Sequence, residues 1–288
     1  MLVSGLLFAI MSVCTRLTSL PGPDRVSVSQ VTFLRFAIGA LVMLPLLRVP
    51  GARLLGDDRR GLVWRGIAGG VAVYLYFLAL HNTTVTNAVL LNNTSILFAP
   101  LFASLLLGER VSRRVAPAGI ASITGILLIT RPTSAAANIG DLYGLLSGVT
   151  AGAALTAVRR LRRTETTSAV LFYFNVVGMP VAALGLLAEP LAWPTARAWW
   201  LIAAIGASSI AAQWLMTYGY RYVRTLEGTL MTLTQVVYAS LGGVLVLAEP
   251  LSSQTLAGGA LVVGSAVWTG LDSGASRRRA PSTSNAPP

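Results

Sequence analysis

Ten long apolar runs, separated by short polar links, set the strongest limit on what this chain can fold into. A helix that spans the hydrocarbon core of a bilayer needs about 20 mostly apolar residues. Spanning strands are not expected, because the runs are too long and show no alternation of period two. Only 11% of the residues are charged, whereas a soluble domain carries about 25%. The sequence therefore predicts an all-α integral membrane protein with ten transmembrane helices, at residues 2–19, 28–48, 62–81, 85–107, 115–131, 141–158, 167–187, 199–219, 226–247 and 254–271.

The basic residues, all 22 of which are arginine, indicate the orientation. Arginine and lysine gather in the cytoplasmic loops of membrane proteins. With the N-terminus in the cytoplasm, 17 arginines fall in inside segments and four in outside segments. We therefore expect both termini to be cytoplasmic, and residues 273–288 to form a disordered cytoplasmic tail. The inside arginines are Arg48, Arg53, Arg59, Arg60, Arg65, Arg110, Arg113, Arg114, Arg159, Arg160, Arg162, Arg163, Arg221, Arg224, Arg277, Arg278 and Arg279.

A weak repeat at an offset of 140 residues divides the chain. LLLGERVS at 105–112 returns as LVLAEPLS at 245–252, which pairs Glu109 with Glu249. Each half then holds five helices, and because five is odd, the second half enters the membrane from the opposite side. We predict two inverted five-helix repeats, at residues 1–131 and 141–271. Inverted repeats are the signature of secondary transporters whose site lies at the midplane.

The motifs of the two halves support a family resemblance. TFLRFAIGALVMLP in the second run, LLLGERVS after the fourth and LAEPLS after the ninth resemble the EamA branch of the drug/metabolite transporter superfamily. Ala248 stands where the motif has a glycine before its glutamate. The resemblance implies a ten-helix bundle, a central cavity and alternating access. Members of the family move small metabolites, often amino acids, and many are exporters.

A polar stretch interrupts the fourth run, at LLNNTSILFAP, residues 90–100. An amide left unpaired in hydrocarbon costs several kcal/mol. Asn92 and Ser95 are three residues apart and share a helix face, and the offset of 140 maps them onto Thr232 and Gln235. We predict that these four side chains bind substrate in a cavity between the halves. Hydrogen bonding between neighbouring helices is the alternative.

Three more side chains are candidate substrate ligands: Tyr76, Trp214 and Arg35. Gln213 and Tyr173 are weaker candidates. A charged residue within a span is by default a functional hypothesis, and Arg35 suits a substrate carboxylate or phosphate. Its position in the outer third of the second helix also allows it to reach the interface, and a structural or gating role stays open. The amide-rich set favours a zwitterionic or polar uncharged solute.

Acidic residues are expected only in loops and at helix ends. Proton-coupled transporters usually hold a carboxylate or histidine within the membrane, and Glu227 and Asp141 are the nearest candidates. We therefore predict facilitated diffusion or exchange without carboxylate-based proton coupling. Glycines are expected where helices approach closely, and Pro100 is expected to kink the fourth helix or to bend it for packing. These glycines are Gly66, Gly69, Gly70, Gly144, Gly148, Gly258, Gly259 and Gly264.

The function predicted from these features is secondary transport of a small, amino-acid-like polar metabolite across the plasma (inner) membrane. The alternative is a membrane-embedded enzyme acting on a lipid, which would need a nucleophile with a base, a metal cluster or paired carboxylates. One cysteine and one histidine do not suffice for these, so no catalytic residue, metal or cofactor is expected. The expected partners are a small-molecule substrate and the lipid bilayer, with a homodimer left open. The arginines lie in short loops, so nucleic acid is not expected.

Overall fold

The structure is a computed structural model that describes residues 2–45, 54–107, 115–130, 138–189, 191, 193–219 and 225–278. Within these residues every regular element is a helix. The helices, in chain order, are α1 (Leu2–Leu17), α2 (Val28–Met43), α3 (Arg59–Asn82), α4 (Val85–Asn92), α5 (Ser95–Leu107), α6 (Val115–Thr130), α7 (Ile139–Leu161), α8 (Thr167–Leu186), α9 (Ala196–Gly219), α10 (Thr225–Leu247) and α11 (Ser253–Arg278).

The predicted apolar runs each contain helix, with two differences. The run at 85–107 is not one continuous helix, because α4 ends at Asn92 and α5 begins at Ser95. The last helix continues to Arg278, beyond the predicted end at 271. The remainder of the predicted tail, 279–288, lies outside the described residues. Within the described residues five stretches are long and apolar enough to cross a membrane: Arg59–Asn82, Val85–Leu105, Ile139–Leu161, Thr167–Leu186 and Ala196–Gly219.

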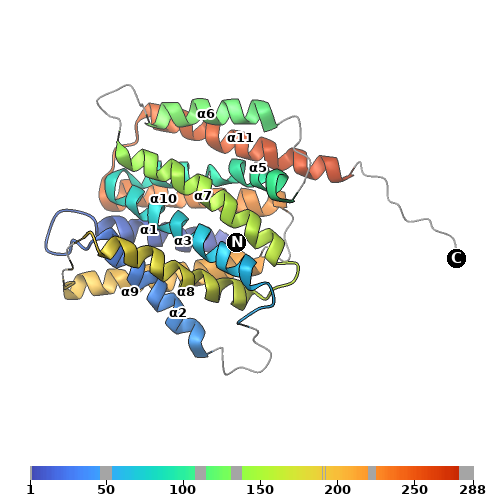
Figure 1. Ribbon diagram of the computed structural model, residues 1–288. Helices are drawn as coiled ribbons and strands as arrows, with labels where there is room; N and C mark the ends of the chain where they lie inside the picture. The colour runs from blue at the N-terminus through green and yellow to red at the C-terminus, as the bar shows by residue number, and fades with distance from the viewer. Residues whose placement is uncertain are drawn as a thin grey trace.

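The helices lie side by side with their axes roughly along one direction (Figure 1). α6 and α11 pair along one side of the bundle, and α2, α8 and α9 form the opposite side. Between them, α3 packs against α7 and α8, and α1 packs against α9 and α10. This arrangement brings helices of the first predicted half into direct contact with helices of the second.

The flanks of the bundle are apolar. Large hydrophobic side chains such as Leu105 (79% exposed), Leu187 and Leu245 point outward, which suits contact with lipid rather than with water. Trp193 and Trp200 are also exposed near one end of the bundle, where aromatic rings favour the membrane interface.

Glycines form the closest helix crossings, as predicted. A Cβ on Gly70 of α3 would lie 2.9 Å from the Cα of Gly178 on α8. A Cβ on Gly258 of α11 would lie 2.6 Å from the carbonyl oxygen of Gly125 on α6. Close approach of this kind lets helices gain van der Waals contact in a membrane. Gly264 is the exception, because nothing lies within 4 Å of its Cβ position, so the prediction was wrong for that residue.

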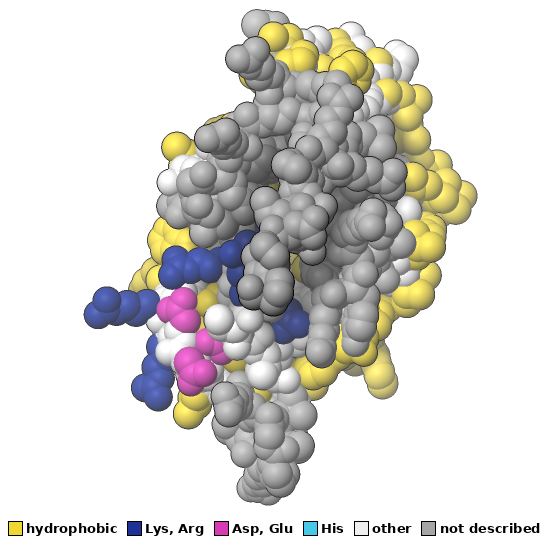
Figure 2. Space-filling model, turned by 90° about the vertical axis from the view of Figure 1, so that its right-hand side faces the viewer, with side chains coloured by type: hydrophobic (Ala, Val, Ile, Leu, Met, Phe, Trp, Pro, Cys, Tyr) yellow, Lys and Arg dark blue, Asp and Glu magenta, His cyan; other side chains and the backbone are white. Residues whose placement is uncertain are grey.

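One end of the bundle, here called the Arg160 end, gathers charged side chains around the start of α3. The Glu165 carboxylate accepts hydrogen bonds from the backbone N–H groups of Asp57 and Asp58, at 2.9 and 2.7 Å. Asp58 in turn caps α3 by accepting from Gly61 N at 2.9 Å. Arg160 lies 3.9 Å from Asp58. Figure 2 shows basic and acidic side chains together on this end, with hydrophobic side chains around the flanks.

Candidate functional site

The polar stretch of the fourth run breaks the helix. Asn93 and Thr94 form a turn between α4 and α5, and both side chains bond back to α4. Asn93 Nδ2 donates to Val89 O at 2.8 Å, and Thr94 Oγ1 donates to Leu91 O at 2.6 Å. These bonds satisfy groups that would otherwise be unpaired in an apolar interior. The helix is therefore interrupted at Asn93 and Thr94, upstream of Pro100. The bend predicted from the sequence was placed at Pro100 itself.

Asn92 and Ser95 lie on either side of the break between α4 and α5. Asn92 Nδ2 donates to Ser147 Oγ of α7 at 2.9 Å, which is a hydrogen bond between neighbouring helices. Ser95 is buried at the start of α5. Thr232 belongs to α10, but its side chain lies outside the described residues.

A hydroxyl cluster joins three helices at the centre of the bundle. The Tyr76 hydroxyl of α3 lies 2.7 Å from Ser12 Oγ of α1. Ser12 donates its own hydrogen to Phe8 O at 2.7 Å, so Tyr76 is the donor to Ser12. The side chain of Gln235 on α10 also hydrogen-bonds Tyr76. We call Ser12, Tyr76 and Gln235 the Tyr76 cluster, in which two of the predicted ligands, Tyr76 and Gln235, meet.

Arg35 borders a small cavity between α2, α8 and α9, here called the Arg35 cavity. The space holds about one water molecule. Its polar lining consists of Arg35, Asn175, Ser209 and Gln213, and Met43, Leu171, Phe174 and Ile210 complete the wall. Arg35 is only 2% exposed, so the suggestion that it reaches the interface was wrong. Gln213 faces this cavity, whereas Trp214, the stronger candidate from sequence, is half-buried and is not among the lining residues.

A second buried arginine, Arg65 of α3, lies beside the first. It is 5% exposed, although its place near the start of α3 had suggested a cytoplasmic loop. Its guanidinium carbon is 4.4 Å from the centre of the Phe174 ring, and that of Arg35 is 5.3 Å from the same ring. Phe77 connects this pair to the Tyr76 cluster: it lies 6.0 Å from Arg35 and 6.3 Å from Tyr76.

Both guanidinium groups lack partners for part of their N–H donors. Nε and Nη1 of Arg35 and of Arg65 are buried without a hydrogen bond. Arg16, Arg160 and Arg197 form ion pairs with acidic side chains, and among the described residues neither buried arginine does. A buried donor left unpaired costs about 1–3 kcal/mol, and more when it is charged. A cation–π contact returns about 0.5–2 kcal/mol, which offsets only part of that cost.

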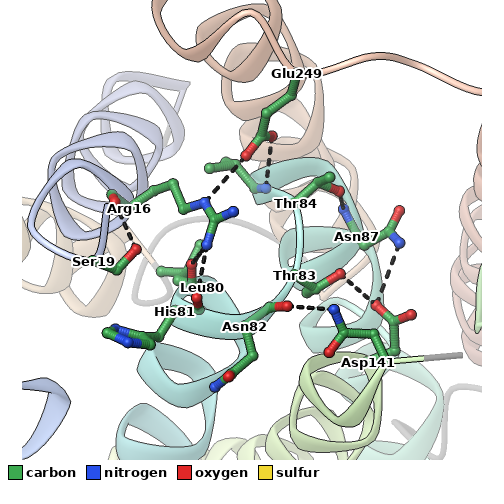
Figure 3. A network of polar contacts seen from close by, with 12 residues as sticks. Arg16, Ser19, Leu80, His81, Asn82, Thr83, Thr84, Asn87, Asp141 and Glu249 are labelled. Carbon is green, nitrogen blue, oxygen red and sulfur yellow. Dashed lines mark hydrogen bonds and ion pairs between the residues drawn. The ribbon is translucent and has the colours of Figure 1, made fainter. Parts of the chain in front are cut away.

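The end of the bundle opposite Arg160, here called the Glu249 end, carries a polar network that joins several helices (Figure 3). Glu249, which follows α10, lies 3.4 Å from Arg16 of α1 and accepts from Val85 N of α4 at 2.8 Å. Arg16 also donates to Leu80 O and His81 O, at 3.1 and 2.7 Å, where α3 ends. A cation is favoured there because the helix C-terminus carries a partial negative charge.

Asp141 makes a second contact at the same end (Figure 3). Its carboxylate accepts from Thr83 Oγ1 at 2.8 Å and from Asn87 Nδ2 at 3.3 Å. It is 4% exposed at the start of α7. Asn138 donates to Asn82 O beside it. Two acids from the second predicted half, Asp141 and Glu249, thus hold the corner between α3 and α4.

Glu249 is only 9% exposed in its side chain. Burial raises the pKa of its carboxyl above the ordinary value, and the opposing effects of Val85 N–H and Arg16 do not cancel this. The Arg16–Glu249 contact therefore connects helices without strongly favouring the ionised carboxylate.

A discontinuous helix, buried cations and a central hydroxyl cluster within a bundle of apolar helices are features of a membrane transporter. The comparison with known families agrees. The chain belongs to the EamA-like transporter family, whose model matches residues 1–131 and 138–271. It is therefore a multi-pass membrane transporter of small metabolites and not an enzyme.

Individual relatives are also transporters. The pseudopaline exporter of Pseudomonas aeruginosa is 31% identical over 82% of this chain and 83% of its own length. The riboflavin transporter of Brucella anthropi is 26% identical over 86% of this chain and 89% of its own length. A protein of known crystal structure has a similar fold, with a TM-score of 0.61 at 22% identity, over 96% of this chain and 99% of that one.

Proposed function

We propose that this chain moves a small polar metabolite across the plasma membrane by alternating access, as an exporter or a facilitator. In this proposal ten spans form two inverted halves of five, and both termini are cytoplasmic. The match of one family model to two successive segments supports the two halves. The relatives named for pseudopaline export and riboflavin transport support an organic metabolite as the substrate.

The Tyr76 cluster is the observation that carries the proposal. It joins α1 and α3 of the first half to α10 of the second, and Tyr76 and Ser12 are 4% and 0% exposed. Transporters bind substrate near the midplane between their halves. A substrate hydroxyl or amine could replace the Tyr76–Gln235 bond when the halves part. Under the proposed orientation the Glu249 end faces outward, so the closed network of Arg16 and Glu249 forms the outer gate.

The expected result is that wild-type protein in proteoliposomes takes up at least one solute from a pooled metabolite extract, as read by mass spectrometry. Tyr76→Phe and Gln235→Ala should each reduce that uptake about tenfold, the effect of losing about one hydrogen bond of strength near 1.4 kcal/mol. A pH gradient should not drive accumulation of the solute inside the proteoliposomes, because no carboxylate is proposed at the centre.

Tyr74→Phe is the matched control. Tyr74 lies on the same helix, and its hydroxyl bonds Ser29 Oγ at 2.9 Å, away from the Tyr76 cluster. Uptake by this variant should stay near that of wild type. Uptake unaffected by Tyr76→Phe and Gln235→Ala would remove the cluster from the transport path, and concentration driven by a pH gradient would refute transport without proton coupling.

A further inference from the structure

We propose that Arg35 and Arg65 together form an oxyanion site, which binds a carboxylate or phosphate group of the transported solute. The inference rests on the proposed transport function and specifies the class of its substrate. The amide-rich sequence motif favoured a zwitterionic or polar uncharged solute. The second buried cation, Arg65, favours a solute that carries a carboxylate or phosphate.

The aromatic rings leave the donor edges of the two cations available. Phe174 contacts both guanidinium groups, and Phe36 lies 4.7 Å from Arg35. A ring in a cation–π contact takes up the charge without accepting the in-plane N–H groups. These N–H groups form the fork that binds carboxylate and phosphate with two parallel hydrogen bonds. Nε and Nη1, which are buried and unpaired in both arginines, lie on different edges of the guanidinium, so each is a single donor that an oxyanion would satisfy.

The other polar side chains that line the Arg35 cavity offer mostly acceptor oxygens, so the positive charge that would hold an anion there comes from the arginine. Gln213 lines it with a buried Oε1 that has no partner, and its amide N–H₂ is a further donor type. Asn175 Nδ2 is already engaged with Leu171 O at 2.8 Å, and Ser209 Oγ donates to Gly206 O at 3.2 Å. Because the cavity holds only about one water molecule, a solute enters only when α2, α8 and α9 move apart, as alternating access requires.

The described acids that could neutralise the pair are engaged elsewhere. Glu165 accepts from the backbone before α3, and Glu189 accepts from Ser29 N at 3.2 Å where α2 begins. Glu249 and Asp141 hold the opposite end of the bundle. Among the described residues no carboxylate lies within 4.0 Å of Arg35 or Arg65. A solute or a lipid headgroup could supply the missing anion. We assign it to a solute, because Arg35 is 2% exposed and does not face the lipid.

The test measures binding to purified protein in detergent, by thermal shift and calorimetry. The probes are succinate, inorganic phosphate and dimethyl succinate, which is succinate without its charges. A separate arm compares nanodiscs with and without phosphatidylglycerol. Succinate or phosphate should raise the melting temperature of wild type with increasing concentration, and dimethyl succinate should not. The presence of phosphatidylglycerol should not change this response.

Variants separate binding from folding. Arg35→Met and Arg65→Met should each weaken anion binding by about tenfold to a hundredfold, the effect of losing a charged hydrogen bond. Arg35→Met should also raise the melting temperature of the empty protein by about 3 °C, because it removes an uncompensated buried charge. Gly69→Ala tests positioning without loss of charge, since its Cβ would collide with Nη1 of Arg65, and it should weaken binding severalfold. Arg160→Gln, at a side chain that is 66% exposed, should bind as wild type does.

Several results would overturn the inference. Equal anion binding by wild type and Arg35→Met is one such result, and no response to succinate or phosphate is another. Stabilisation by dimethyl succinate equal to that by succinate is a third. Stabilisation by phosphatidylglycerol without added anion is the fourth. Failure of the proposed function gives a different result. Succinate binding through Arg35 without uptake of any solute would refute the proposed function, in which the Tyr76 cluster carries transport, and keep the anion site. Uptake of neutral solutes alone, unchanged in Arg35→Met, would refute the anion site and keep transport.

Discussion

Gly148→Leu is expected to lower the free energy of unfolding by about 3 kcal/mol, the upper range for overpacking a close contact. Gly148 of α7 faces the turn between α4 and α5, and a Cβ there would lie 2.6 Å from Leu91 O and close to Thr94 Oγ1. The Leu91 carbonyl is part of the backbone, so it cannot move aside as a flexible side chain would. Chemical unfolding in micelles, followed by circular dichroism, measures the loss.

Gly264→Leu is the control, because it introduces the same side chain into a helix where nothing lies within 4 Å. It should be neutral or slightly stabilising, since leucine favours a helix over glycine by about 0.5–1 kcal/mol. Equal effects of the two substitutions would show that α7 does not pack against the turn at Thr94.

Glu249→Ala is expected to lower the free energy of unfolding by about 2 kcal/mol. The substitution removes the acceptor for Val85 N, an N-terminal capping bond of about 1 kcal/mol, and leaves Arg16 without its carboxylate partner. Glu249→Gln keeps an acceptor oxygen for Val85 N, so it should lose less than about 1 kcal/mol. A full loss in Glu249→Gln would mean that charge, rather than the hydrogen bond to α4, holds this end together.

The pH dependence of Glu249 has a definite sign. Burial raises the pKa of its carboxyl in the folded protein above the unfolded value. The stability tied to its protonation is therefore fully present below the unfolded pKa and is lost as pH rises through the raised folded pKa. Wild type should lose stability relative to Glu249→Gln as pH rises from the ordinary pKa of glutamate through the raised folded pKa. Parallel stability curves for the two proteins across this range would contradict the raised pKa.

The sequence predicted the helices well because each apolar run had to satisfy its own backbone in lipid. It did not predict the break at Asn93 and Thr94, since a stretch of four polar residues, 92–95, in a helix-length run is compatible with a continuous helix. Side-chain hydrogen bonds from Asn93 to Val89 O and from Thr94 to Leu91 O favour the break. These side-chain bonds compete with the backbone hydrogen bonds of the helix. A hydrophobic pattern does not reveal them.

The candidate site was predicted in part. Tyr76, Gln235 and Arg35 were proposed from polarity within apolar runs, and the structure places them in or beside buried polar groups. Arg65 was missed because it was counted with the cytoplasmic loop, although it lies inside the predicted run 62–81. Treating every arginine inside a run as a span residue would have found it.

The partners of these residues could not be predicted from one sequence. Ser12, which accepts from Tyr76, is an ordinary small residue of α1. Ser147, which accepts from Asn92, is 55 residues away along the chain. Glu249 was noted as a repeat of Glu109, but its contact with Arg16 depends on how α1 and α10 pack. Glu109 itself lies outside the described residues.

The central claim is that the Tyr76 cluster is reached alternately from the two sides of the membrane. The most direct measurement is the labelling rate of Ser12→Cys, in a Cys14→Ser background, by a membrane-impermeant thiol reagent applied to right-side-out and to inside-out vesicles. Ser12 is fully buried beside Tyr76, so labelling requires the bundle to open. Alternating access predicts labelling from both sides, with faster labelling from the Glu249 end when Glu249→Ala is added. Labelling from one side only, or at a rate that Glu249→Ala leaves unchanged, would contradict it.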